Sequence, residues 1–90
     1  MTGYIKNLTD TELDACILIN PKLFGKMMLE EMGITGSFYS LKLEDKDSYR
    51  IVWSNSKHRS YSSVIDRYNI RSRLGDNEIM ATVEDISNRE

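Results

Sequence analysis

The sequence predicts an α+β fold in which two N-terminal helices pack on one face of a small antiparallel sheet of about four strands. Apolar residues recur at helical spacing up to Gly33, and after it they alternate at the two-residue period of strands. A length of 90 residues supports one hydrophobic core. We therefore expect a single domain, residues 1–90, with a frayed tail over 86–90.

The first helix has a clear start signal. Thr9 and Glu12 have the spacing of a capping box, in which each side chain satisfies a backbone N–H of the other residue. The apolar stripe that follows includes Leu13, Cys16 and Ile17. We expect the helix to end at Asn20, because the residue before a proline avoids helical geometry.

The second helix begins at Pro21, since proline is well tolerated in the first helical position. Its apolar face follows helical spacing and is interpreted as core: Leu23, Phe24, Met27, Met28 and Met32. Gly33 is suited to end the helix in a left-handed conformation. Gly25 lies inside the helix, where it predicts close packing against a neighbour.

A hairpin follows the helices. Tyr39, Leu41 and Leu43 alternate with polar residues, as do Tyr49, Ile51 and Trp53 with their neighbours, and the polar segment 45–48 separates the two runs. Half of the residues in 54–63 are serine, which predicts a loop, and this loop also carries basic residues.

Residues 64–74 fit two interpretations. As a strand, they place Tyr68, Ile70 and Leu74 on the sheet's inner side and the polar residues Arg67, Asn69, Arg71 and Arg73 on the other. The alternative is a third helix over 63–74, with Tyr68 inward and Ile70 outside, accompanied by a hairpin and a final strand. The strand leaves fewer exceptions. The turn residues 75–77 then precede a last alternating run of Ile79, Ala81 and Val83.

The charges are segregated along the chain. Residues 1–48 carry five Lys and eight acids, 49–73 carry six Lys/Arg and one acid, and 74–90 carry one Arg and five acids. A basic segment between acidic flanks predicts contact with an anionic partner, and the alternative is that its own flanks neutralise it inside the fold. The expected partner-binding residues are Arg50, Lys57, Arg59, Arg67, Asn69, Arg71 and Arg73.

No pattern in the sequence indicates catalysis. Cys16 falls on a buried helix stripe, and His58 is the single histidine, so neither a nucleophile–base pair nor a four-ligand zinc site is specified. We expect no enzyme activity, no cofactor and no metal. One cysteine, the lack of a signal-peptide pattern and the lack of a long apolar run predict a cytoplasmic protein without membrane association.

These observations favour a small interaction protein of the regulator or inhibitor type. It would bind the acidic surface of a larger protein or nucleoprotein through the basic segment, and 90 residues provide enough surface for a standard interface. Nucleic-acid binding through the same segment is the alternative hypothesis. An open sheet face or an unpaired edge strand would also suit a homodimer.

Overall fold

The computed structural model describes residues 2–80 and confirms the α+β class, with two N-terminal helices beside an antiparallel sheet. Three strands form the main sheet in the order β2-β3-β4, and β1 pairs with β5 in a separate two-stranded sheet. The elements are β1 (Thr2–Tyr4), the 3-10 turn η1 (Ile5–Asn7), α1 (Asp10–Ile19), α2 (Pro21–Glu31), β2 (Ser37–Leu43), β3 (Ser48–Ser54), β4 (Ser60–Asp66), α3 (Arg67–Leu74) and β5 (Glu78–Met80).

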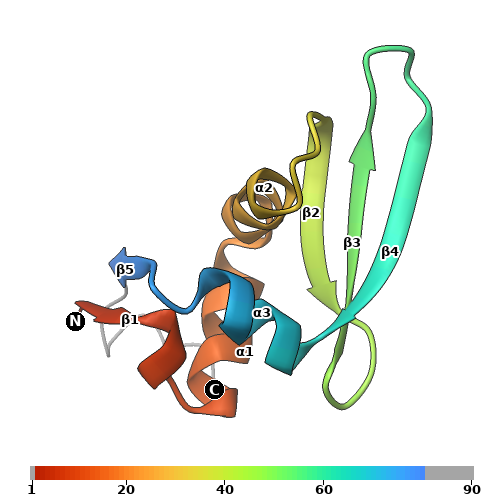
Figure 1. The fold of residues 1–90 in the computed structure, drawn as a ribbon. Helices are drawn as coiled ribbons and strands as arrows, with labels where there is room; N and C mark the ends of the chain where they lie inside the picture. Colours follow the sequence, from red (N-terminus) through yellow and green to blue (C-terminus); the bar gives the residue numbers. More distant parts are fainter. Residues whose placement is uncertain (1, 81–90) are drawn as a thin grey trace.

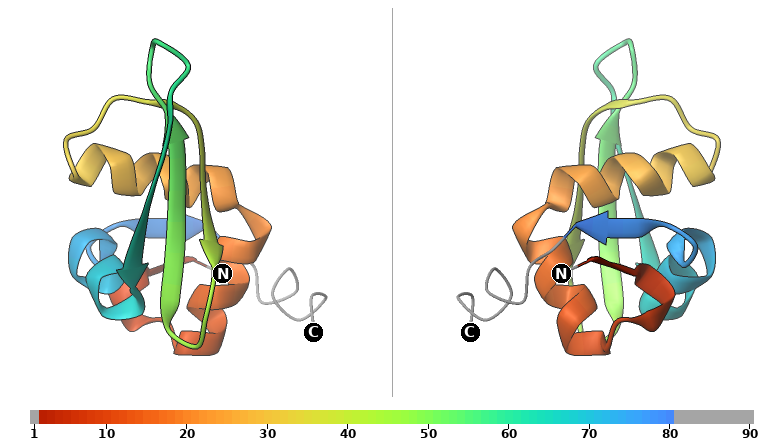
Figure 2. Two further views of the ribbon diagram at one scale, coloured as in Figure 1. Left: turned by 90° about the vertical axis from the view of Figure 1, so that its right-hand side faces the viewer. Right: turned by 90° about the vertical axis from the view of Figure 1, so that its left-hand side faces the viewer.

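The helices lie on one face of the main sheet and leave the other face open (Figure 2). The β3–β4 hairpin extends beyond the ends of β2 and α2, so its loop projects from the body of the molecule (Figure 1). At the opposite end of the view, β1 and β5 lie side by side. The fold therefore has one projecting end and one end where the first and last described strands meet.

The helix boundaries follow the predicted signals. Glu12 N donates to Thr9 Oγ1 at 3.1 Å, and Thr9 N donates to Glu12 Oε1 at 2.9 Å, which completes the capping box. Pro21 opens α2, and Gly33 adopts a φ of 71° just after it. Ile34 N then donates to Leu29 O at 2.9 Å, which ties the turn back to the helix.

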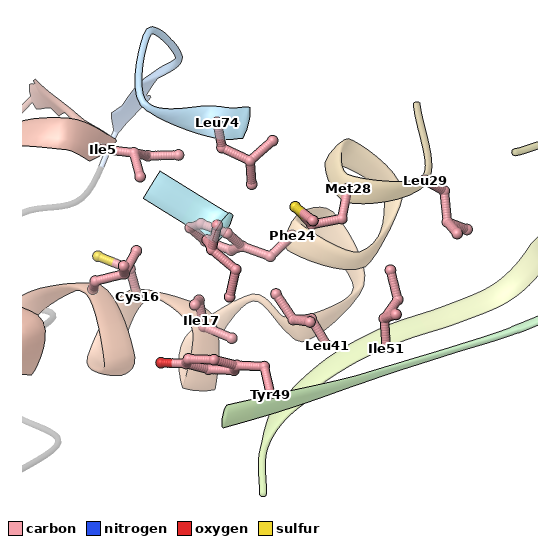
Figure 3. Close-up of a cluster of buried hydrophobic side chains, with 12 residues drawn as sticks. Ile5, Cys16, Ile17, Phe24, Met28, Leu29, Leu41, Tyr49, Ile51 and Leu74 are labelled. Carbon is pink, nitrogen blue, oxygen red and sulfur yellow. The ribbon is translucent and has the colours of Figure 1, made fainter. Parts of the chain in front are cut away.

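The core lies between the helices and the sheet. Leu41, Tyr49 and Ile51 supply its sheet side, whereas Tyr39 and Trp53 are partly buried and Leu43 is exposed. Figure 3 shows Leu41, Tyr49 and Ile51 meeting the side chains of the helices. The remaining buried hydrophobic side chains are those of Ile5, Leu13, Cys16, Ile17, Phe24, Met28, Leu29, Ile70 and Leu74. The interpretation of the α2 face as core is correct for Phe24 and Met28, and Met27 and Met32 pack partly buried against them. It is wrong for Leu23, which is exposed.

Close packing at Gly25 is confirmed. A Cβ at this position would lie 2.9 Å from the backbone N of Ser40 and 3.0 Å from its Cα. Any side chain would therefore push α2 away from β2. Gly25 sets the short distance between the second helix and the edge of the sheet.

The favoured strand over 64–74 is correct for residues 64–66, which end β4, and wrong for 67–74. Residues 67–74 form the helix α3, and Asp66 caps it by accepting from Asn69 N at 2.7 Å. The helical alternative is also corrected, because the helix begins at Arg67 and turns the opposite face inward. Ile70 and Leu74 are fully buried, whereas Tyr68 is 78% exposed. Positions 68 and 70 are separated by about 200° around a helix, so only one of them can face the core.

The predicted loop is shorter than expected, because only residues 55–59 remain outside strands and β4 begins at Ser60. Serines therefore pair along β3, where Ser62 faces Val52 and Ser63 faces Ile51. The main sheet has three strands instead of about four, and β5 pairs with β1 outside it. The predicted positions Ala81 and Val83 and the tail 86–90 lie outside the described residues.

Within residues 2–80, no helix has the length and apolar character needed to cross a membrane.

Candidate interaction surface

The basic residues expected to form one surface lie on three different parts of the molecule. Lys57 and Arg59 belong to the projecting hairpin loop, and Arg50 lies on the open face of the sheet. The other four predicted residues belong to α3: Arg67, Asn69, Arg71 and Arg73. The expected alignment of arginines along a strand does not form, because the segment that carries them is helical.

Arg67 is used inside the fold. Its Nη2 lies 2.9 Å from Asp14 Oδ2 and 2.8 Å from the backbone O of Lys46, and its side chain is only 13% exposed. Asp14 also accepts from the hydroxyl of Tyr49. The hydrogen bond to Asp14 raises the pKa of Arg67 above its ordinary value. Arg67 therefore holds α3 against α1 and the β2–β3 turn.

Arg71, one helical turn after Arg67, holds α3 against the segment before α1. Its Nη1 donates to Leu8 O at 2.6 Å and to Ile5 O at 3.3 Å, and its Nη2 donates to Asp10 Oδ1 at 2.7 Å. The hydrogen bond from Arg71 lowers the pKa of Asp10. Because both arginines satisfy groups of their own chain, neither offers a free guanidinium to a partner.

The remaining predicted partner-binding residues on the sheet and on α3 do not form a continuous basic surface. Arg50 Nε lies 2.6 Å from Glu44 Oε1, and its Nη1 donates to Ser62 Oγ at 3.0 Å, so its charge is matched on the open face. Asn69 and Arg73 are exposed on α3. They lie on a different element from Lys57 and Arg59.

The hairpin loop has an ordered backbone. His58 N donates to Asn55 O at 3.0 Å, and Asn55 N donates to Arg59 O at 3.0 Å. The side-chain Oδ1 of Asn55 accepts from both Lys57 N and Arg59 N at 2.9 Å. Asn55 therefore fixes the loop internally. Within residues 2–80, neither Lys57 nor Arg59 has an ion-pair partner.

Two stacked aromatic rings support the base of this hairpin. The rings of Trp53 and Tyr61 face each other across β3 and β4 with centroids 5.7 Å apart and an interplanar angle of 20°. The Tyr61 hydroxyl accepts from Asn55 Nδ2 at 3.2 Å. Gly36 packs closely against the indole, since a Cβ there would lie 2.9 Å from Trp53 Cδ1. The stacked rings therefore hold β3 and β4 together at the base of the loop.

Phe38 adds an exposed aromatic ring at the same end of the sheet. Ser37 pairs with Ser54 and Ser40 pairs with Val52, so Phe38 and Tyr39 together oppose a single β3 residue and form a β-bulge. Phe38 has a φ of 54°, which is rare for a bulky residue, and it is 82% exposed. We define the distal surface as Phe38, Lys57, His58, Arg59 and Tyr61.

A second surface feature is an apolar groove between the end of α1 and the edge of β2. It encloses about 600 Å³. Leu18 on α1 is 67% exposed and Leu43 on β2 is 48% exposed. The lining also includes Asp14, Ala15, Ile17, Pro21, Leu41, Lys42 and Tyr49. The alternating pattern predicts Leu43 in the covered core, so this groove could not be predicted from it.

The structure gives little support for chemistry at Cys16 or His58. Cys16 is buried, and desolvation raises the pKa of its thiol, which disfavours the reactive thiolate. His58 lies in the exposed loop, away from Cys16 on α1. Among residues 2–80, no group of three His, Cys, Asp or Glu side chains is arranged to hold a metal ion.

Sequence reasoning found the two loop cations but missed Phe38. Its position is out of phase with the alternating residues Tyr39 and Leu41, so the strand pattern does not include it. An aromatic residue that lies beside a serine and breaks the two-residue alternation of the strand could have indicated an exposed ring. No protein-family model, curated protein or solved structure matches this chain.

Proposed function

We propose that this protein is a non-enzymatic binding protein of the regulator or inhibitor type, which inserts its distal surface into an acidic recess of a larger protein. The projection of the β3–β4 hairpin beyond the body of the fold carries this proposal (Figure 1). A projecting loop reaches into a concave site that a flat sheet face could not enter. Its two cations, Lys57 and Arg59, match an acidic recess in charge.

The distal surface also has the composition of a strong protein-binding site. Aromatic residues and arginine dominate the energetics of protein interfaces, and Phe38, Tyr61 and Arg59 are of this kind. The bonds made by Asn55 order the loop before it meets a partner. Less conformational entropy is then lost on binding. Phe38 in its left-handed conformation is an unfavourable arrangement that a binding role would explain.

A protein is favoured over nucleic acid because the described residues leave few free cations at this site. Arg67 and Arg71 are engaged within the chain, which leaves Lys57 and Arg59 on the distal surface. Two cations would neutralise about two phosphates and give a salt slope of about −2, which is typical of weak binding at physiological salt.

The test is site-specific photo-cross-linking from position 56 in an extract of the source cells. We expect a discrete cross-linked protein that disappears in the double variant Lys57→Glu/Arg59→Glu and weakens with Phe38→Ala. The matched control is Lys26→Glu/Arg73→Glu, which reverses the same number of exposed charges on α2 and α3, outside the distal surface, and should leave the product unchanged.

Three results would contradict the proposal. They are a cross-link that survives the Lys57/Arg59 reversal, one that is lost equally in the Lys26/Arg73 control, and one that nuclease treatment removes. In the last case, fluorescence anisotropy with single-stranded DNA, duplex DNA and RNA at increasing salt would measure the number of phosphates contacted. Nucleic-acid binding would then replace protein binding as the function.

A further inference from the structure

The groove beside β2 lies at an unpaired edge of the main sheet. β2 pairs with β3 on one side only, and no other strand of residues 2–80 lies along its free side (Figure 2). Glu44 N donates to Ser48 O at 2.8 Å, so the backbone of Glu44 faces β3. Because successive residues of an antiparallel strand face opposite sides, the N–H and C=O of Leu43 point toward the open edge. This position can accept another strand.

The side chains around this edge are unusual for an isolated chain. Leu43 and Leu18 expose apolar surface next to the groove, where exposed strand edges more often carry protective charges. On the opposite face of β2, Lys42 lies directly across from Arg50, which is a like-charge pair. Within residues 2–80, Lys42 has no ion-pair partner to offset this repulsion.

We propose that this edge pairs with the same edge of a second copy of the chain, with the two-fold axis midway between Leu43 of one copy and Leu43 of the other. In this antiparallel register Leu43 faces Leu43 of the second copy, and their backbones exchange two hydrogen bonds. Two three-stranded sheets then become one six-stranded sheet. The axis is perpendicular to the sheet, so the helices of both copies lie on the same face.

The charges of β2 are complementary to themselves in this register. Lys42 lies opposite Glu44 of the second copy, and Glu44 lies opposite Lys42 of the second copy. Both side chains project on the open face of the sheet, since Lys42 precedes Leu43 in β2 and Glu44, directly after the strand, binds Arg50 on that face. Each Lys42 then gains an acidic neighbour on the side away from Arg50. Glu44 keeps its bond to Arg50 and accepts the second cation.

The apolar grooves of the two copies also lie next to each other in this dimer. Leu43 shares the helix-covered face with Leu41, so the two Leu43 side chains meet beneath the joined sheet. There they cover the exposed Leu18 of each copy. The interaction uses neither Lys57 nor Arg59, so the distal surface of each copy remains accessible and the two interactions can be tested separately.

The test measures self-association of the full chain by sedimentation velocity from about 1 µM to about 1 mM. We expect dimers in the wild type. Lys42→Glu alone and Glu44→Lys alone should each raise the dissociation constant by about tenfold or more, because each replaces two opposite-charge pairs with two like-charge pairs.

An equimolar mixture of these two variants should form a heterodimer. Positions 42 and 44 are both acidic in the first variant and both basic in the second, so every cross-strand pair in the mixed dimer joins opposite charges. Native mass spectrometry with one isotope-labelled variant would detect this species.

Leu43→Glu provides a second disrupting variant, and its partial exposure makes it compatible with folding, which circular dichroism would verify. Val64→Lys is the control on the opposite edge strand, β4, and should leave the dissociation constant unchanged. A monomer at every concentration would overturn the proposal. So would a dimer that tolerates all β2 variants, a mixture without heterodimer, or a dimer lost only in Val64→Lys.

Discussion

Individual residues of this protein show how a polar side chain can stabilise backbone that has no regular secondary structure. Asn55 satisfies two amides of the hairpin loop with one oxygen, and Arg71 satisfies two carbonyls before α1 with one nitrogen. His58 adopts a φ of 61° in the same loop, a conformation that costs an L residue free energy. The loop geometry imposes that conformation on a residue that does not favour it.

We therefore predict that His58→Gly stabilises the protein by about 0.5–1 kcal/mol, because glycine adopts a positive φ without steric cost. For a domain of this size, the melting temperature should rise by a few degrees. Thermal denaturation followed by circular dichroism would measure it. Ser56→Gly is the control, since Ser56 has no positive φ and glycine there should destabilise the loop. An unchanged or lower melting temperature for His58→Gly would contradict this reasoning.

Among the secondary-structure elements, α3 differs most from the sequence-based expectation. Its eight residues include three arginines and only two buried apolar side chains, Ile70 and Leu74. Helical and strand periodicities are hard to separate in so short a segment. Long-range contacts decide the outcome, because Asp14, Asp10 and three backbone carbonyls hold Arg67 and Arg71 in place. None of these partners is near α3 in the sequence.

Two substitutions in α3 test its orientation. Ile70→Ala should lower the free energy of unfolding by about 2–5 kcal/mol, because it leaves a cavity in the core. Tyr68→Ala should change it by less than about 0.5 kcal/mol, because that ring is largely exposed. Urea denaturation of both variants gives the comparison. A larger loss for Tyr68→Ala than for Ile70→Ala would mean that the helix presents its other face to the core.

The elements predicted correctly are those whose signals are local. Thr9 and Glu12 define the start of α1, Pro21 starts α2, Gly33 ends it, and alternation identifies β2 and β3. The interaction surface could be predicted only in part. Lys57 and Arg59 stand out in the sequence, but the bulge at Phe38 depends on strand register, and the internal use of Arg67 depends on long-range contacts.

For the molecule as a whole, an ionic network joins segments that are distant in sequence. Asp10 and Asp14 on α1 bind Arg67 and Arg71 on α3, and Arg67 also contacts the β2–β3 turn through Lys46 O. The network connects the N-terminal half of the chain with the last helix. Its stabilising effect should depend on pH, because the pKa of Asp10 is lowered in the folded protein.

A lowered pKa means that the folded state binds fewer protons than the unfolded state in the acid range. The contribution of Asp10 is therefore fully present above about pH 5 and is lost as the pH falls through its ordinary pKa of 3.8 and below. In the variant Asp10→Asn, the free energy of unfolding should decrease less steeply as the pH falls from about 5 to about 2.5. Denaturant titrations at several pH values would measure the slope, and an unchanged slope would show that Asp10 is not responsible.

The pairing of β1 with β5 has a consequence for how the chain reaches this structure. Thr2 aligns with Met80, so this two-stranded sheet closes a loop containing nearly the whole described chain. Closing so long a loop has a high entropic cost until the intervening helices and strands have brought its ends together. The two end strands should therefore assemble last during folding and separate first during unfolding. Hydrogen exchange at their amides would report the completion of the fold and the first stage of its loss.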